Sequence, residues 1–86
     1  MCGVSSNSAR RVVCSAVARI LREERERQNL SMTVLSERAG LSQQSVSYVE
    51  REMRIPSLDT LLRITGVLGV DLADVIKRAT KSARVK

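Results

Sequence analysis

Two adjacent glutamines, Gln43 and Gln44, carry side chains that are well suited to reading the edge of a nucleic-acid base. A glutamine amide holds a donor and an acceptor side by side, so it can form two hydrogen bonds with the N6/N7 edge of adenine in the major groove. The segment 42–50 has the character of a short helix, and both glutamines fall in its first turn. They would therefore project together from one end of that helix.

A second helical segment and a tight turn precede the glutamines. Residues 33–39 have helical character, and Gly40 follows where one helix must stop before the next begins. Glycine adopts a positive φ without steric cost, so the chain can reverse direction there. The pattern predicts a helix, a tight turn and a second helix, with apolar Leu35, Val46 and Val49 fixing the angle between the two helices.

Three further helices are predicted around this pair. An apolar stripe at helical spacing predicts a long first helix from about Ser8 to Gln28, with Asn29 as its left-handed cap. A connector around Pro56 separates the third helix from a fourth that ends at Gly69. The expected N-caps of the four later helices are Ser31, Ser42, Ser57 and Asp71. Because no segment shows sustained period-two alternation, the predicted fold class is all-α.

The length of 86 residues predicts one small domain. Its hydrophobic content of 43% suffices for a core, but Phe and Trp are absent and Tyr48 is the one aromatic residue, so the core must be aliphatic. We expect a flexible N-terminal arm over residues 1–8, a folded domain over 9–80 with the two-helix motif at about 32–52, and a basic tail over 81–86.

A formal net charge of +6 favours a polyanionic partner, either nucleic acid or an anionic membrane surface. Arginine and lysine concentrate before and after the two-helix motif. Between Thr33 and Ser47 the charged residues are Glu37 and Arg38 alone, so charge by itself does not locate the site.

Other classes of function have little support. Cys2 and Cys14 are too few for a disulfide framework, and without histidine no Cys/His metal set is expected, so we predict reduced thiols and no metal or cofactor. No nucleophile motif or phosphate-binding glycine loop favours an enzyme. No apolar run reaches membrane-spanning length and no signal peptide is evident, which predicts a cytoplasmic protein.

A set of signposts extends over most of the chain: Leu30 and Ser31, Leu35 with Ala39 and Gly40, Val46, Val49 and Glu50, the run 56–62, and Leu68 to Val70. In these residues the chain, from about Leu21 to Ile76, resembles the phage-repressor and Cro-type (XRE-type) helix-turn-helix family of transcriptional regulators. The resemblance implies a five-helix, lambda-repressor-like DNA-binding domain with a long first helix.

The resemblance also implies roles for single residues. Base edges would be read by Gln43, Gln44, Ser47 and Tyr48. Phosphates would be held by Ser31, Thr33, Ser42, Arg51 and Arg54. Arg25 and Glu50 would form a structural ion pair, and a dimer interface would include Val67, Val70 and Ile76. Alternatives remain for three of these roles: the pair could be solvated surface charges, Tyr48 could cover the core, and the dimer residues could complete the monomer core.

Two positions depart from the family pattern. Members usually carry glutamine at the first residue of the second helix, where it holds a phosphate, and here that residue is Met32. Many members have glycine two residues after the glutamate, and here that residue is Glu52, so the exit from the third helix is expected to run differently. Arg51 and Arg54 are candidates for compensating phosphate contacts.

As a whole, the resemblance implies a sequence-specific regulator that binds double-stranded DNA as a homodimer at a near-palindromic operator, without a small-molecule effector. The alternative is a protein- or RNA-interaction module, such as the antitoxin of a toxin–antitoxin pair. A membrane-surface role for the basic first helix is disfavoured because its apolar stripe lacks bulky aromatic residues.

Overall fold

The computed structural model describes residues 3–84, and the side chains of residues 10–82. Five α-helices and no strand occupy the described range: α1 (Gly3–Arg27), α2 (Met32–Ala39), α3 (Gln43–Glu50), α4 (Leu58–Leu68) and α5 (Leu72–Arg84). The prediction of an all-α, five-helix fold with a long first helix is confirmed. Within the described residues, no helix combines the length and the hydropathy needed to cross a membrane.

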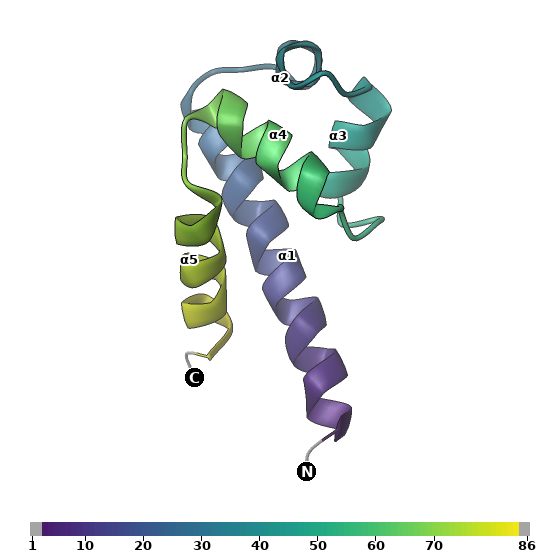
Figure 1. The fold of residues 1–86 in the computed structure, drawn as a ribbon, viewed down its shortest axis with the longest axis vertical. Helices are drawn as coiled ribbons and strands as arrows, with labels where there is room; N and C mark the ends of the chain where they lie inside the picture. Colours follow the sequence, from purple (N-terminus) through teal and green to yellow (C-terminus); the bar gives the residue numbers. More distant parts are fainter. Residues whose placement is uncertain (1–2, 85–86) are drawn as a thin grey trace.

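The long helix α1 sets the shape of the molecule, which measures 43 × 20 × 18 Å (Figure 1). Helix α5 packs along α1, whereas α2, α3 and α4 gather around the C-terminal half of α1. The two-helix unit of α2 and α3 is therefore carried at one end of the domain, and α1 and α5 extend away from it.

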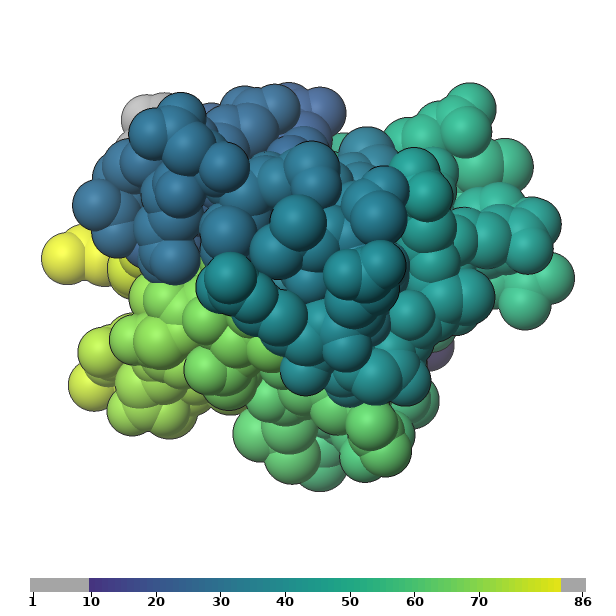
Figure 2. All heavy atoms as spheres, turned by 90° about the horizontal axis from the view of Figure 1, so that it is seen from above, coloured from purple at the N-terminus to yellow at the C-terminus, as the bar shows by residue number. Residues whose placement is uncertain are grey.

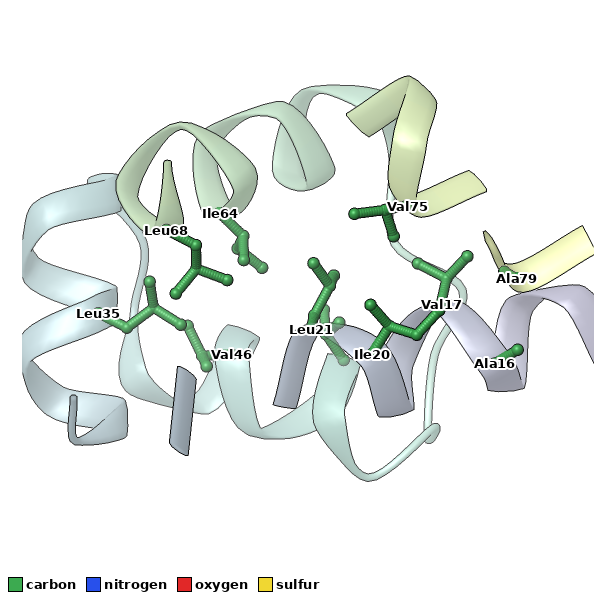
Figure 3. Close-up of a cluster of buried hydrophobic side chains, with 11 residues drawn as sticks. Ala16, Val17, Ile20, Leu21, Leu35, Val46, Ile64, Leu68, Val75 and Ala79 are labelled. Atoms are coloured by element: carbon green, nitrogen blue, oxygen red, sulfur yellow. The ribbon is translucent and has the colours of Figure 1, made fainter. Parts of the chain in front are cut away.

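The core is aliphatic, as the composition predicts. Leu21 lies near its middle and is fully buried (Figure 3). On one side of it, Leu35 and Val46 join α2 and α3 to α4, and on the other side Val17 meets Val75 of α5. One continuous cluster of buried side chains thus connects the two-helix unit to the α1–α5 pair.

Side-chain caps begin the four later helices, at the residues predicted from the sequence. The hydroxyls of Ser31, Ser42 and Ser57 each accept a hydrogen bond from the backbone N–H three residues further on, at 3.0 to 3.1 Å. A carboxylate oxygen of Asp71 accepts from the N–H of Ala73 at 3.1 Å. These caps satisfy donors that the first turn of a helix leaves without partners.

One backbone motif ends each of the helices α1 to α4. Asn29, Gly40, Glu52 and Gly69 have positive φ angles of 59°, 72°, 61° and 73°. The residue after each of them donates its N–H to the carbonyl five residues earlier, at 2.8 to 3.1 Å. This is the bond pattern of a Schellman motif, which closes a helix and turns the chain away.

The start of the first helix differs from the prediction. α1 begins at Gly3 instead of near Ser8, and α5 continues to Arg84, into the expected tail. Residues 3–8 contain no proline, and adding turns to an existing helix gains hydrogen bonds without a new nucleation cost. Residues 1–2 of the expected arm and 85–86 of the expected tail lie outside the described residues. The division into arm, domain and tail otherwise stays a prediction.

Candidate nucleic-acid interface

The two faces of α3 differ sharply in burial. Val46, Val49 and Glu50 are buried, whereas Gln43 and Gln44 are exposed at the start of the helix. In the face shown in Figure 2, the teal spheres of α2 and α3 lie on the outer surface of the molecule. The helix is therefore anchored through its apolar residues while its two glutamines face solvent.

A buried ion pair ties α3 to α1. The guanidinium of Arg25 donates two hydrogen bonds to the carboxylate of Glu50, with Nε–Oε2 at 2.7 Å and Nη2–Oε1 at 3.0 Å. Arg25 and Glu50 are only 9% and 5% exposed, and Arg25 Nη1 also donates to the carbonyl of Leu30 at 2.7 Å. The hydrogen bond to Glu50 raises the pKa of Arg25 above its usual value, against the opposing effect of burial. This pair, which the family resemblance implies, is thus a bidentate buried contact, not two solvated charges.

On the outer side, three side chains form a chain of contacts. The amide nitrogen of Gln44 donates to the hydroxyl of Tyr48 at 2.6 Å. The guanidinium carbon of Arg54 lies 5.0 Å from the centre of the Tyr48 ring, a cation–π distance. Gln44 and Tyr48, which are expected to read bases, are therefore in contact with Arg54, which is expected to hold a phosphate. The sequence alone does not predict these two contacts.

The residues expected to read bases differ in their exposure to solvent. Gln43 is exposed beside Gln44, and Ser47 is half-buried one turn further along. Tyr48 is also half-buried, so its ring both covers part of the helix surface and presents its hydroxyl to Gln44. The structure thus brings Gln44 and Tyr48 into contact.

The hydroxyls expected at phosphates are engaged in helix caps. Ser31 and Ser42 accept their capping bonds, and the Ser42 hydroxyl lies 2.9 Å from that of Ser45. Thr33 is exposed in the first turn of α2, and Arg51 is exposed just after α3. A phosphate role for these residues stays a prediction.

The exit from α3, which the sequence comparison with the family expects to run differently because of Glu52, closes with the same left-handed motif that ends α1, α2 and α4. Glu52 has a φ of 61°, which gives the backbone the left-handed conformation that glycine would supply at this position. Its carboxylate accepts a hydrogen bond from the hydroxyl of Ser15 on α1 at 2.7 Å. The chain therefore leaves α3 through the ordinary motif, and the negative side chain is held against α1. Ser15 was missed in the sequence because this contact joins residues 37 positions apart.

The expected dimer residues occupy different environments. Val67 and Val70 are half-buried and pack against the core, in line with the alternative that they complete the monomer. Ile76 is 39% exposed and lines a groove of about 920 Å³ with Leu62 and Leu72. An apolar surface therefore exists between α4 and α5. Of the three residues expected at a dimer interface, Ile76 lines this surface.

Metal ligands and cysteine thiols form no cluster in the described part of the chain. It contains no group of three or more metal-ligating side chains. Cys14 is a half-buried free thiol on α1, and Cys2 lies outside the described residues.

Two helices joined by a glycine turn, with the second held against the core and its first turn exposed, define a helix-turn-helix domain. The family described as helix-turn-helix matches residues 21–75, which is more than half of the chain, and the chain belongs to that family.

Curated relatives and a solved structure agree with this assignment. The uncharacterized HTH-type transcriptional regulators MT0491 and Rv0474, from two strains of Mycobacterium tuberculosis, are each 41% identical over 59 residues. These matches cover 69% of this chain but 42% of each relative, so the chain spans less than half the length of the curated relatives that it matches. The crystal structure of the clp gene regulator ClgR from Corynebacterium glutamicum is similar with a TM-score of 0.75 and 27% identity, covering 83% of this chain and 76% of that chain.

Proposed function

We propose that this protein is a sequence-specific, double-stranded DNA-binding transcriptional regulator. The observation that carries the proposal is the exposed first turn of α3, with Gln43 and Gln44, on a helix fixed by the buried Arg25–Glu50 pair. Rigid presentation of this kind allows the start of a recognition helix to enter a major groove. Membership of the helix-turn-helix family and the names of the relatives support the proposal.

Base reading is proposed for α3. Gln43 and Gln44 would contact base edges through their amides, and Ser47 and Tyr48 would lie along the same groove. A bidentate amide contact distinguishes adenine because the adenine edge offers an acceptor and a donor together.

Phosphate contacts are proposed for the two helix starts and the connector. Backbone N–H groups at the start of α2, with Ser31 and Thr33, would replace the amide that Met32 lacks. Ser42 would act at the start of α3. After α3, exposed Arg51 and Arg54 supply positive charge next to the recognition helix. These contacts would set affinity and orientation without reading sequence.

A homodimer is proposed because one short helix reads few base pairs. Two copies would bind a near-palindromic operator with half-sites about 34–36 Å apart. The exposed apolar surface that includes Ile76 is the best candidate for the contact between copies, and Val67 and Val70 would contribute to it only where the core leaves them exposed. Such a regulator would act in the cytoplasm, where bacterial DNA is found.

Selection of bound sequences from a random DNA pool tests this proposal. We expect enrichment of one half-site sequence, repeated with two-fold symmetry, and binding that weakens steeply with salt. Enrichment of isolated half-sites would remove the dimer and leave the DNA-binding function. No enrichment at all would overturn the proposal and favour the protein- or RNA-interaction module.

A further inference from the structure

We propose that Tyr48 is a positioning residue that sets the specificity of Gln44 and links it to the phosphate contact of Arg54. The proposal rests on the DNA-binding function proposed above and deepens it. It changes the expected role of Tyr48 from a direct base contact to an action through two neighbouring side chains.

The contact between Gln44 and Tyr48 constrains a side chain that would otherwise be mobile. Both lie on the same side of α3, four residues apart, where side chains on a helix meet. The Gln44 nitrogen donates to the Tyr48 hydroxyl at 2.6 Å. Because glutamine has several rotatable bonds, fixing its amide before binding removes part of the entropy cost of ordering it on DNA.

The donor count of the amide is compatible with base reading. A glutamine amide has two N–H donors and one carbonyl acceptor. Tyr48 uses one N–H, which leaves the other N–H and the carbonyl of Gln44 for the N7 and N6 groups of adenine. The hydroxyl therefore holds the amide without consuming the pair of groups that reads the base.

The ring of Tyr48 has a second neighbour. The guanidinium carbon of Arg54 lies 5.0 Å from the centre of the ring, a cation–π contact that limits the positions of the guanidinium. The N–H donors of a guanidinium lie in its own plane, so this contact with the aromatic face does not use them. Tyr48 is half-buried, whereas Gln44 and Arg54 are exposed. The less exposed ring is thus the fixed member between two longer, exposed side chains.

Tyr48→Phe and Tyr48→Leu separate the two actions. The probes are the DNA sequence selected from a random pool and variants of it that differ at one base pair. That base pair is the one at which Gln44→Ala lowers the discrimination between bases. Tyr48→Phe removes the hydroxyl and keeps the ring, so discrimination at that pair should fall about threefold to tenfold while the salt dependence stays unchanged. Tyr48→Leu also removes the ring and should in addition weaken binding to all sequences by about twofold to fivefold.

A double-mutant cycle decides whether Tyr48 acts through Gln44. In the Gln44→Ala background, Tyr48→Phe should leave discrimination unchanged, because the side chain that it positions is gone. An equal loss in both backgrounds would show a direct base contact by Tyr48 and overturn the proposal. Full discrimination by Tyr48→Phe would overturn it as well. Equal melting temperatures of the variants and the parent serve as the folding control.

A measurement without DNA separates this proposal from the proposed function. In the free protein, Tyr48→Phe should shift the side-chain amide NMR signals of Gln44, whereas Ser47→Ala, a neighbouring change outside the contact, should shift them little. Shifted signals together with no sequence selectivity in the parent would overturn the DNA-binding function and, with it, the positioning role. Selective binding by the parent with unshifted signals would overturn the positioning role alone.

Discussion

The helix-turn-helix face and the α4–α5 face of this domain expose opposite kinds of side chain. On the first, Gln44, Tyr48 and Arg54 are polar or amphipathic and contact one another. On the second, Leu58, Leu62 and Ile76 are apolar, with exposed fractions of 64%, 53% and 39%. A polar surface with its hydrogen-bonding groups already ordered suits a polar, charged partner, whereas an exposed apolar patch suits another protein surface.

The two faces are also supported differently from within. The polar face rests on a helix whose inner side carries the buried pair of Arg25 and Glu50. The apolar face rests on α4 and α5, whose inner side chains Ile64, Leu68 and Val75 belong to the aliphatic core. The polar face is therefore held by a buried ion pair in addition to the packing of Val46 and Val49, whereas the apolar face is held by hydrophobic packing.

Loss of Glu50 should break the support of the polar face and have the largest effect. Glu50→Ala leaves the Arg25 guanidinium buried without its partner, which typically costs about 3–5 kcal/mol of unfolding free energy. Urea unfolding followed by circular dichroism measures the change. The matched control is Asp59→Ala, which removes the exposed ion pair to Arg63 and should cost less than about 1 kcal/mol. Equal losses of unfolding free energy in the two variants would show that the buried pair stabilises the fold no more than an exposed pair does.

Ile76→Glu tests the function of the apolar face. A carboxylate placed in an interface between two copies would lose its hydration without gaining a partner, so we expect a folded monomer, reduced operator affinity and loss of cooperative binding. Analytical ultracentrifugation and DNA titration measure these properties. Thr80→Glu, at a half-buried position that lines the same groove, should weaken the assembly in the same direction. A parent protein that sediments as a monomer at high micromolar concentration and binds half-sites as well as full palindromes would exclude the dimer.

Gln44→Ala and Arg54→Ala should divide the polar face into two functions. Gln44→Ala should lose about 1–3 kcal/mol of discrimination at one or two base pairs in each half-site. Arg54→Ala should weaken binding to all sequences alike and reduce the salt slope by about one unit. Quantitative binding to the selected operator and its single-base variants over a salt series measures both. If the two variants altered specificity in the same way, the separation between base reading and phosphate contact would be wrong.

Most of the fold could be predicted because its signals are local. The caps Ser31, Ser42 and Ser57 and the left-handed residues Asn29, Gly40 and Gly69 act within one turn of their own helix, so sequence order reveals them. The start of α1 lies earlier than the sequence predicts because no local signal marks it, and the sequence leaves the end of α5 open for the same reason. At the start of α1, further turns add hydrogen bonds to an existing helix without a new nucleation cost.

The site could be predicted in its residues but less well in its contacts. The positions of Gln43, Gln44 and Tyr48 follow from helical spacing, and the residues of the buried pair follow from the family resemblance. The contact of Arg54 with Tyr48 depends on how the connector folds back, and the contact of Glu52 with Ser15 joins distant segments. Neither leaves a periodic pattern in the sequence.

Substitutions of Glu52, at the edge of the polar face, should change the unfolding free energy least. At this position backbone strain opposes the stabilisation from a side-chain hydrogen bond. A non-glycine residue at a φ of 61° costs about 1 kcal/mol relative to glycine, and the exposed hydrogen bond to Ser15 is worth about 0.5–1 kcal/mol. Glu52→Gly relieves the strain but loses the bond, so its unfolding free energy should stay within about 0.5 kcal/mol of the parent. Glu52→Ala keeps the strain and loses the bond, so it should fall below Glu52→Gly by about 1 kcal/mol. Urea unfolding of the three proteins measures both differences, and Ser15→Ala should equal the loss from the bond alone. If Glu52→Ala were as stable as Glu52→Gly, the left-handed turn would carry no measurable strain.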